Sequence, residues 1–467
     1  VTMTGGWVDG ALEAVRAAVE QGDWDGALDL LAELPVDVDR GETLELRAQA
    51  AYGAGEFESA VQAWEDLYTH ELDRDDRAAA ARAAAMIAMY LMMDTGLMAP
   101  VRGWLRTAER LLEGTHATPA HALIAMTRTY ERFMCGDMDA AREWSARSIE
   151  LGTATGTSPA VVIGRTCAAR VRILDGDLRG GLDQLEEVGA LLMAGGADPL
   201  TTGMMYCEII CAAQGLGRHD MAGEWTRIMD TWRHGAAVGG INGRCRVHRA
   251  EILRVAGPCD EAEAEALGAC DELRPWMRRE FGWPLAELGN IRLRRGDLAG
   301  AEEAFLDAQH HAWSPQPGLA LVHLARGDAD TAATMIADEI DHPLDIPSKE
   351  RPPFGDLRLA PLLEAQAEIA VARDDRDTAA RAASRLTDIA ERFPGPFLAA
   401  SAALAQAREA LLEGATEKAT RLGGDAVAAW TDIGAPYEAA TARLVAGAAH
   451  ERAGRPDAAR REWRAAA

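Results

Sequence analysis

The fold is decided by a short joint whose clearest copy reads Gly296-Asp297-Leu298-Ala299-Gly300-Ala301. Most copies share a glycine, then an acid or an arginine, and an alanine five residues after the glycine. Glycine provides the positive φ that ends one helix, and an acid suits the first turn of the next helix. Each joint therefore predicts a hairpin of two helices. The copies start at Gly22, Gly55, Gly136, Gly176, Gly217, Gly257, Gly296, Gly327, Gly414 and Gly454.

The joints recur at a nearly fixed spacing. Gly96 and Asp374 occupy the two positions where a copy is missing, and most neighbouring joints are then 39 to 41 residues apart. A fixed period of this size is the signature of a solenoid. A single compact core is not expected for 467 residues, because such cores stop growing at about 250–300 residues.

An aromatic residue follows many joints by eight or nine positions. At helical spacing such a column is typical of packing between repeats, and a ligand cage is the alternative. Joint and aromatic together resemble the tetratricopeptide repeat (TPR), although that repeat has a shorter period of about 34 residues. The sequence therefore predicts an all-α, right-handed superhelical solenoid of about twelve TPR-like hairpins, with residues 1–467 as one domain. The aromatic residues are Trp64, Trp104, Trp144, Trp225, Phe305 and Trp463.

Two proline-rich segments interrupt the repeat. Residues 343–361 contain five prolines and are predicted to form an inserted loop, because proline removes a backbone donor and restricts the residue before it. Loops of this length are often functional, and an inert surface excursion is the alternative. The segment Ser314-Pro315-Gln316-Pro317-Gly318 predicts an abrupt entry into the following helix.

Composition narrows the classes of partner. The formal net charge of −26 argues against direct nucleic-acid binding, which requires clustered lysine and arginine. Residues 1–10 lack the features of a signal peptide, and no apolar run is long enough to span a membrane. We therefore expect a cytoplasmic protein that binds neither nucleic acid nor membrane.

Sequence motifs give no sign of a cofactor or a metal site. The seven cysteines are odd in number and include no Cys-x-x-Cys, which favours reduced thiols in the core. The adjacent histidines His310 and His311, with His323 beyond the proline turn, are expected to be exposed, because neighbours on a helix point about 100° apart. Motifs for phosphate, dinucleotide or zinc-protease chemistry are absent from the sequence. We therefore expect no cofactor and no metal.

The candidate binding residues appear when the first helices of the hairpins are aligned on their joints. The positions thirteen, nine and six residues before a joint share one helix face, because they are four and three residues apart. In a solenoid such a face lines the concave channel. The candidates are Glu208, Arg244, His248, Glu251, Trp283, Glu287 and Asn290.

These residues allow three interpretations. The ladder can bind a small polar molecule or peptide, or it can be a solvated wall whose charges compensate one another. An enzyme built around His248, Glu287 and Glu208 is a further alternative, but acid–base catalysis needs a mutual geometry that a column of repeats does not establish. We therefore predict a protein without catalytic residues.

Four segments resemble the MalT-like helical sensor region of LuxR-family transcriptional regulators. They are residues 243–253, 296–304, 315–321 and 434–440, and weaker similarity covers nearly the whole chain. The resemblance implies a regulatory scaffold that senses a protein partner or a small-molecule or peptide effector in its concave groove. A general protein-interaction adaptor is the alternative. Regulators of this family end in a DNA-binding helix-turn-helix, and nothing like it occurs up to Ala467, so direct DNA binding by this chain is not expected.

Overall fold

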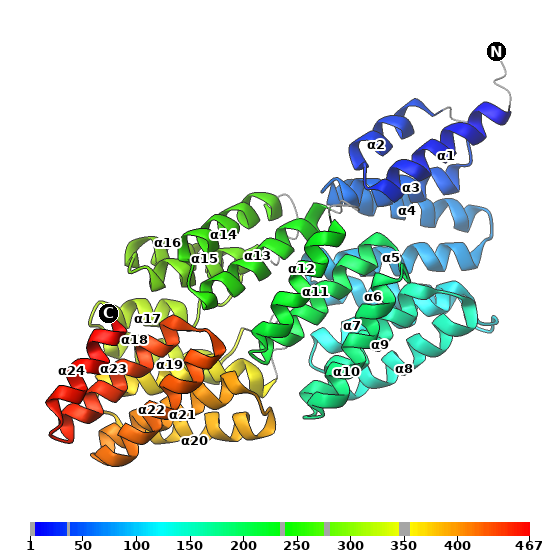
Figure 1. Ribbon diagram of the computed structural model, residues 1–467. Coiled ribbons are helices and arrows are strands. Elements are labelled where there is room, and N and C mark those ends of the chain that lie inside the picture. Colours follow the sequence, from blue (N-terminus) through cyan, green and yellow to red (C-terminus); the bar gives the residue numbers. More distant parts are fainter. Residues whose placement is uncertain (1–4, 35–37, 234–238, 275–280, 345–354) are drawn as a thin grey trace.

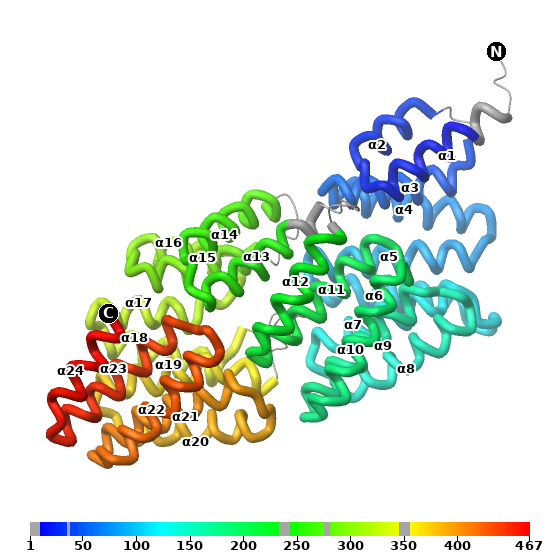
Figure 2. Tube along the Cα trace, in the orientation of Figure 1, coloured from blue at the N-terminus to red at the C-terminus, as the bar shows by residue number. Residues whose placement is uncertain are grey.

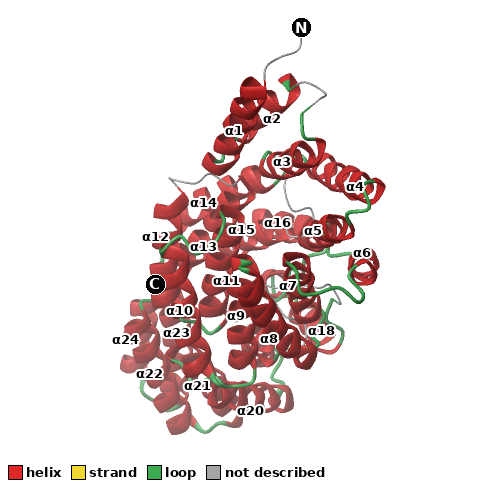
Figure 3. Cartoon of the chain, turned by 90° about the vertical axis from the view of Figure 1, so that its right-hand side faces the viewer, coloured by secondary structure: helices red, strands yellow, loops and turns green. Residues whose placement is uncertain are grey.

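The computed structural model describes residues 5–34, 38–233, 239–274, 281–344 and 355–467. Within these ranges the chain forms twenty-four α-helices and no strand, as Figure 3 shows. The first six hairpins are α1 (Gly5–Gln21) with α2 (Trp24–Glu33), α3 (Arg40–Gly53) with α4 (Phe57–Asp73), α5 (Arg77–Thr95) with α6 (Met98–Leu111), α7 (Pro119–Met134) with α8 (Met138–Thr155), α9 (Ser158–Leu174) with α10 (Leu178–Met193), and α11 (Pro199–Gly215) with α12 (His219–Arg233).

The remaining helices pair in the same way, and a short 3-10 helix, η1 (Asp356–Arg358), precedes the tenth hairpin. The last six hairpins are α13 (Gly239–Ala256) with α14 (Cys259–Leu273), α15 (Gly282–Arg294) with α16 (Leu298–His310), α17 (Gly318–Ala325) with α18 (Ala329–Asp341), α19 (Leu359–Ala372) with α20 (Arg376–Arg392), α21 (Pro396–Glu413) with α22 (Thr416–Ile433), and α23 (Pro436–Arg452) with α24 (Pro456–Ala466).

The joints connect the helices as the sequence predicts. At the clearest copy, Gly296 has a φ of 79° and the Asp297 amide donates to the Arg292 carbonyl over 3.0 Å, which closes α15. The Asp297 carboxylate then accepts from the amide of Gly300 at 3.0 Å and caps α16. Asp297 therefore contacts both helices, through its backbone amide and through its carboxylate. The sequence predicts only a favourable charge in the first turn of α16, whereas the carboxylate caps that helix directly. All twelve predicted joint positions have a positive φ, so the hairpin prediction is confirmed.

Asp374 is the one joint residue that is not glycine, and its φ of 54° is costly for a residue with a Cβ. We expect Asp374→Gly to raise the free energy of unfolding by about 1 kcal/mol, because glycine adopts this backbone freely. The matched control is Asp377→Gly in the first turn of α20, which should lower it by about 1 kcal/mol. Urea unfolding measures both, and a lower midpoint for Asp374→Gly would contradict this account of the joint.

The column of aromatic residues packs between hairpins. Trp64 and Phe305 are each 1% exposed, and Trp225 is buried as well. The Trp64 ring meets Tyr90 of the next hairpin edge-on at 6.1 Å between ring centres. The packing interpretation of these positions is confirmed.

The stack of hairpins curves back on itself, as the chain trace in Figure 2 shows. Arg392 at the end of α20 donates to the carbonyl of Leu174 at the end of α9 over 3.0 Å, although 218 residues separate them. Phe397 of α21 packs on Gly217, in the joint between α11 and α12. The largest core cluster accordingly contains residues between 81 and 245 and again between 360 and 405. The solenoid is therefore a superhelix whose late hairpins touch its middle hairpins (Figure 1).

The two proline-rich segments differ in structure. Within residues 343–361, positions 345–354 lie outside the described residues, and η1 covers Asp356–Arg358. Helix α19 already begins at Leu359, so the end of the predicted loop is helical, since proline at position 361 is tolerated in a first turn. Residues 314–317 form the turn into the short helix α17. Among the described helices, none combines the length and the apolar character needed to cross a membrane.

Candidate functional site: a chamber on the concave face

The closure of the superhelix forms a chamber of about 880 Å³ that is partly open to solvent. Its wall is built mainly from the first helices of successive hairpins, α9, α11, α13, α15, α17, α19, α21 and α23. The turn at residues 314–317 and the described ends of the proline-rich segment complete the wall. A volume of this size is typical of sites for small molecules, which range over about 300–1,000 Å³. The lining comes mainly from the middle hairpins and the last three hairpins, whose helices are labelled in Figure 1.

Four of the seven predicted binding residues lie in the chamber wall. They are Glu251 of α13 and Trp283, Glu287 and Asn290 of α15. Counting back from the joints therefore identifies part of the concave surface that lines the chamber. Whether this surface binds a ligand stays a prediction.

The other three predicted residues, Glu208, Arg244 and His248, are buried behind the wall and do not line it. Glu208 forms a buried ion pair with Arg170 of α9. The offsets from the joints place these three on the first helices correctly, but the neighbouring helices cover them. The structure also does not bring His248, Glu287 and Glu208 together in the chamber, as the enzyme alternative requires.

His248 instead meets two cysteines of α11. Its Nε2 lies 3.1 Å from Cys207 Sγ and 3.9 Å from Cys211 Sγ. These three residues are the group in the described part of the chain whose ligand atoms are placed to hold a metal ion. The sequence predicts core cysteines and no metal site, because the cysteines are odd in number and include no Cys-x-x-Cys. His248 lies 41 residues from Cys207 and 37 from Cys211, so no local motif joins the three residues. All seven cysteines are free thiols.

Ion pairs run along the chamber wall. Arg254 Nε of α13 contacts Glu287 Oε1 of α15 at 2.5 Å, and Asn290 donates to the other carboxylate oxygen at 3.5 Å. Arg294 pairs with Glu438 of α23 and donates to the carbonyl of Arg254 at 2.9 Å. One ladder therefore joins α13 and α15 to α23 across the closure.

Burial raises the pKa of Glu287 above its ordinary value of 4.5, since loss of solvation outweighs the attraction of Arg254. The folded state then binds this proton more tightly than the unfolded chain, so protonation of Glu287 favours folding. This gain in the free energy of unfolding begins as the pH falls through the raised pKa of Glu287, and it is complete below the ordinary pKa of 4.5. We expect the stability of wild type relative to Glu287→Gln to rise as the pH is lowered from neutral toward 4.5, measured by urea unfolding. A difference that stays constant or shrinks would contradict the assigned direction.

Three side chains at the chamber carry polar atoms that lack a hydrogen bond. Both ring nitrogens of His219, the Nε1 of Trp430 and the Oε2 of Glu438 are buried without a hydrogen bond in the described part of the chain. Burial lowers the pKa of His219 to about 4, helped by Arg254, so its ring is neutral at pH 7. Buried polar groups are nearly always hydrogen-bonded, and exceptions require an explanation. A polar occupant of the chamber would satisfy these groups.

The lining combines aromatic surface with an excess of acid. The arginines are outnumbered by the glutamates, four to six, which makes the lining formally negative by two charges. Arg294 already lies over the ring of Tyr437, 4.6 Å from its centre, so the wall holds cations against aromatic faces. The arginines are 170, 254, 294 and 358; the glutamates are 251, 287, 339, 364, 368 and 438; the aromatic residues are Trp283, Phe305, Trp313, Phe397, Trp430 and Tyr437.

Sequence reasoning missed several residues of the wall. Arg254 and Arg294 lie three and four residues after Glu251 and Asn290, so one further helical turn on the same face would have found them. His219, Tyr437 and Glu438 carry no such signal, because only the closure of the superhelix brings them to the chamber.

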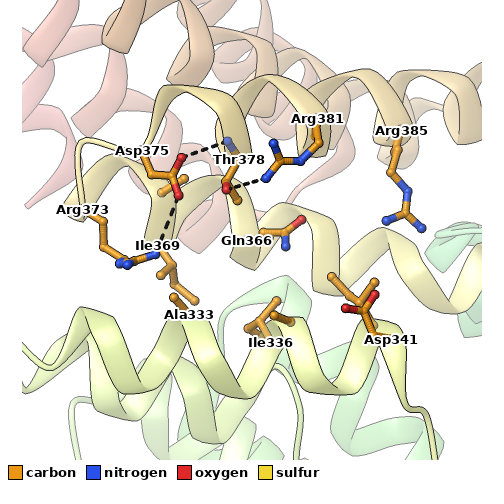
Figure 4. A pocket seen from close by; sticks show the side chains of 13 residues that line it. Ala333, Ile336, Asp341, Gln366, Ile369, Arg373, Asp375, Thr378, Arg381 and Arg385 are labelled. Carbon is orange, nitrogen blue, oxygen red and sulfur yellow. Dashed lines mark hydrogen bonds and ion pairs between the residues drawn. The ribbon is translucent and has the colours of Figure 1, made fainter.

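A second, smaller groove of about 280 Å³ lies between α18, α19 and α20 (Figure 4). Arg373, Arg381 and Arg385 line it. Arg373 contacts Asp330 at 2.8 Å and Arg381 donates to Thr378 at 2.9 Å, so two of the three cations are already engaged. The larger chamber is therefore the better candidate site.

No protein-family model matches the sequence, and no curated protein matches it. Solved structures with a similar path of the chain include the APC/C hetero-tetramer Cut9–Hcn1, with a TM-score of 0.47 and 12% identity over 97% of this chain and 85% of the other. Aspartyl phosphate phosphatase F from Bacillus subtilis has a TM-score of 0.44 and 10% identity, over 67% of this chain and 95% of the other. Rap protein complexed with Competence and Sporulation Factor has a TM-score of 0.35 and 13% identity, over 90% of this chain and 100% of the other. Likenesses at this level do not identify what this chain binds.

Proposed function

We propose that the protein is a non-catalytic sensing scaffold whose chamber binds a small molecule, or a peptide of a few residues, that carries an amine or guanidinium group. The observation that carries this proposal is the pair of buried acceptor atoms without a hydrogen bond at the chamber, Glu438 Oε2 and one ring nitrogen of neutral His219, because an ammonium or guanidinium group only donates. The acidic excess and the six aromatic side chains of the lining favour a cation with an apolar body.

Ligand binding would act on the closure of the superhelix. Each hairpin of a solenoid contacts mainly its neighbours, so the curvature of the stack adjusts at low cost. A ligand that touches α13 and α15 on one side and α23 on the other binds the closed form better, and it shifts the population toward that form. In this proposal the chain has the regulatory role of the sensor regions of LuxR-family regulators, which it resembles at residues 243–253 and 434–440.

A thermal-shift screen tests the proposal directly. The panel contains primary amines, guanidines and tripeptides, each beside its neutral N-acetylated counterpart. A ligand at one hundred times its Kd adds about 2.7 kcal/mol of stability, so we expect amines to raise Tm and acetylated partners to have no effect. The shift should be lost in the double variant Glu251→Gln/Glu364→Gln, which removes two lining carboxylates.

The matched control is Glu143→Gln/Glu391→Gln, which removes two exposed carboxylates away from the chamber. It should keep the full shift. A panel without any amine-specific shift would contradict the proposal, as would an equal loss of the shift in both double variants.

A further inference from the structure

Behind the chamber wall, two cysteines and a histidine converge from neighbouring hairpins. Cys207 and Cys211 are one turn apart on α11, and His248 comes from α13. Cys207 and His248 are fully buried, and Cys211 is 8% exposed. The two sulfur atoms and the histidine Nε2 all lie within 4.8 Å of one another.

These separations approach those of a coordinated metal ion. Bonds of about 2.3 Å to sulfur and about 2.0 Å to nitrogen place ligand atoms about 3.5–4 Å apart around zinc. The measured separations from Nε2, 3.1 Å to Cys207 and 3.9 Å to Cys211, bracket this range. A cation between the three atoms therefore requires only small side-chain shifts.

The histidine is held in the orientation that a ligand needs. Its Nδ1 lies 2.6 Å from Gln214 Oε1, and because an amide oxygen only accepts, Nδ1 carries the proton. The lone pair of Nε2 then faces the two sulfur atoms. The Trp283 ring packs edge-on against the imidazole at 4.9 Å between centres. Metal-binding histidines are typically oriented by such a second hydrogen bond.

Two guanidinium groups lie close to the cysteines. Arg244 Nη1 donates to Cys207 Sγ at 3.6 Å, and the charge of Arg170 acts on Cys211. Nearby guanidinium groups stabilise thiolates, which are the metal-binding form.

We propose that Cys207, Cys211 and His248 bind one thiophilic metal ion of the zinc(II) or copper(I) class. Thiolate and imidazole are the ligands that such ions prefer. Three protein ligands leave one position open, and both Cys211 and Trp283 line the chamber. An ion held here lies beside the chamber, within reach of its occupant. The site is tested without a chamber ligand, so its failure and that of the proposed function are distinguishable.

Cobalt(II) is the first probe, added without oxygen to the reduced chain of residues 1–467. We expect one equivalent to bind, with thiolate-to-cobalt charge-transfer absorption in the near ultraviolet, and zinc(II) to displace it. Cys207→Ser, Cys211→Ser and His248→Ala should each abolish stoichiometric binding, whereas Cys270→Ser, a buried thiol outside the cluster, should leave it unchanged. Gln214→Ala removes only the positioning contact and should weaken zinc binding about 10–100-fold.

X-ray absorption of the zinc-loaded wild type needs no variant and therefore does not depend on how the variants fold. We expect two sulfur ligands at about 2.3 Å and an imidazole in the first shell. Stoichiometric binding of copper(I) in competition with bathocuproine, without binding of cobalt or zinc, supports the site and assigns the ion to copper. A first shell of oxygen and nitrogen alone overturns the proposal, as does absence of stoichiometric binding for all three ions or equal loss in Cys270→Ser.

Discussion

Gly217→Ala is expected to lower the free energy of unfolding by about 2–5 kcal/mol and to loosen the closed superhelix. Gly217 has a φ of 67°, and alanine in this left-handed conformation lowers the stability of the folded state by about 1–2 kcal/mol. A Cβ here would also stand 2.3 Å from Cβ of Phe397, so α21 must move away. Such overpacking costs about 1–3 kcal/mol. Urea unfolding measures the loss, and small-angle scattering measures the opening.

Gly296→Ala is the matched control. Gly296 has a similar φ of 79°, but an added Cβ would meet no other atom within 4 Å. This variant should lose only the backbone term of about 1–2 kcal/mol and should keep the scattering curve of wild type. If both variants lost equal stability and scattered alike, the contact between Gly217 and Phe397 would not contribute to closure.

Glu287→Ala is expected to destabilise the protein by about 3–5 kcal/mol at pH 7. Glu287 is 5% exposed and its partner Arg254 is largely buried. Removing the carboxylate takes away the one that pairs directly with the buried Arg254 guanidinium, and breaking one side of a buried ion pair costs more than the pair itself contributes. Urea unfolding at neutral pH gives the value.

The double variant Glu287→Ala/Arg254→Met distinguishes the loss of the ion pair from the cost of burying an unpaired cation. Because methionine removes the buried cation, most of the lost stability should return, to within about 1–2 kcal/mol of wild type. A double variant that is less stable than Glu287→Ala alone would show that the ion pair contributes attraction beyond its burial cost.

The repeat could be predicted because it is encoded locally. Each joint needs a residue with positive φ at one position and a capping side chain beside it, and both are readable from residues such as Gly296 and Asp297. Asp374 was identified from spacing alone, and its φ of 54° confirms the position.

The closure could not be predicted, because it depends on small rotations between hairpins that add up over the stack. The contact of Gly217 with Phe397 joins residues 180 positions apart and has no local signal. For this reason the helix-face pattern found Glu287 and Asn290 but placed His248 in the channel, although α11 and α15 bury it. The pairing of His248 with Cys207 and Cys211 is hidden in the same way.

The middle and late hairpins close around one chamber. The most direct test is the distance between spin labels introduced through unnatural amino acids at Asp175 and Glu391, which flank the contact between Leu174 and Arg392. Pulsed electron spin resonance should give one narrow, short distance in wild type and in Gly296→Ala, and a longer, broader one in Gly217→Ala. A broad, long distribution in the wild type would contradict the closed chamber.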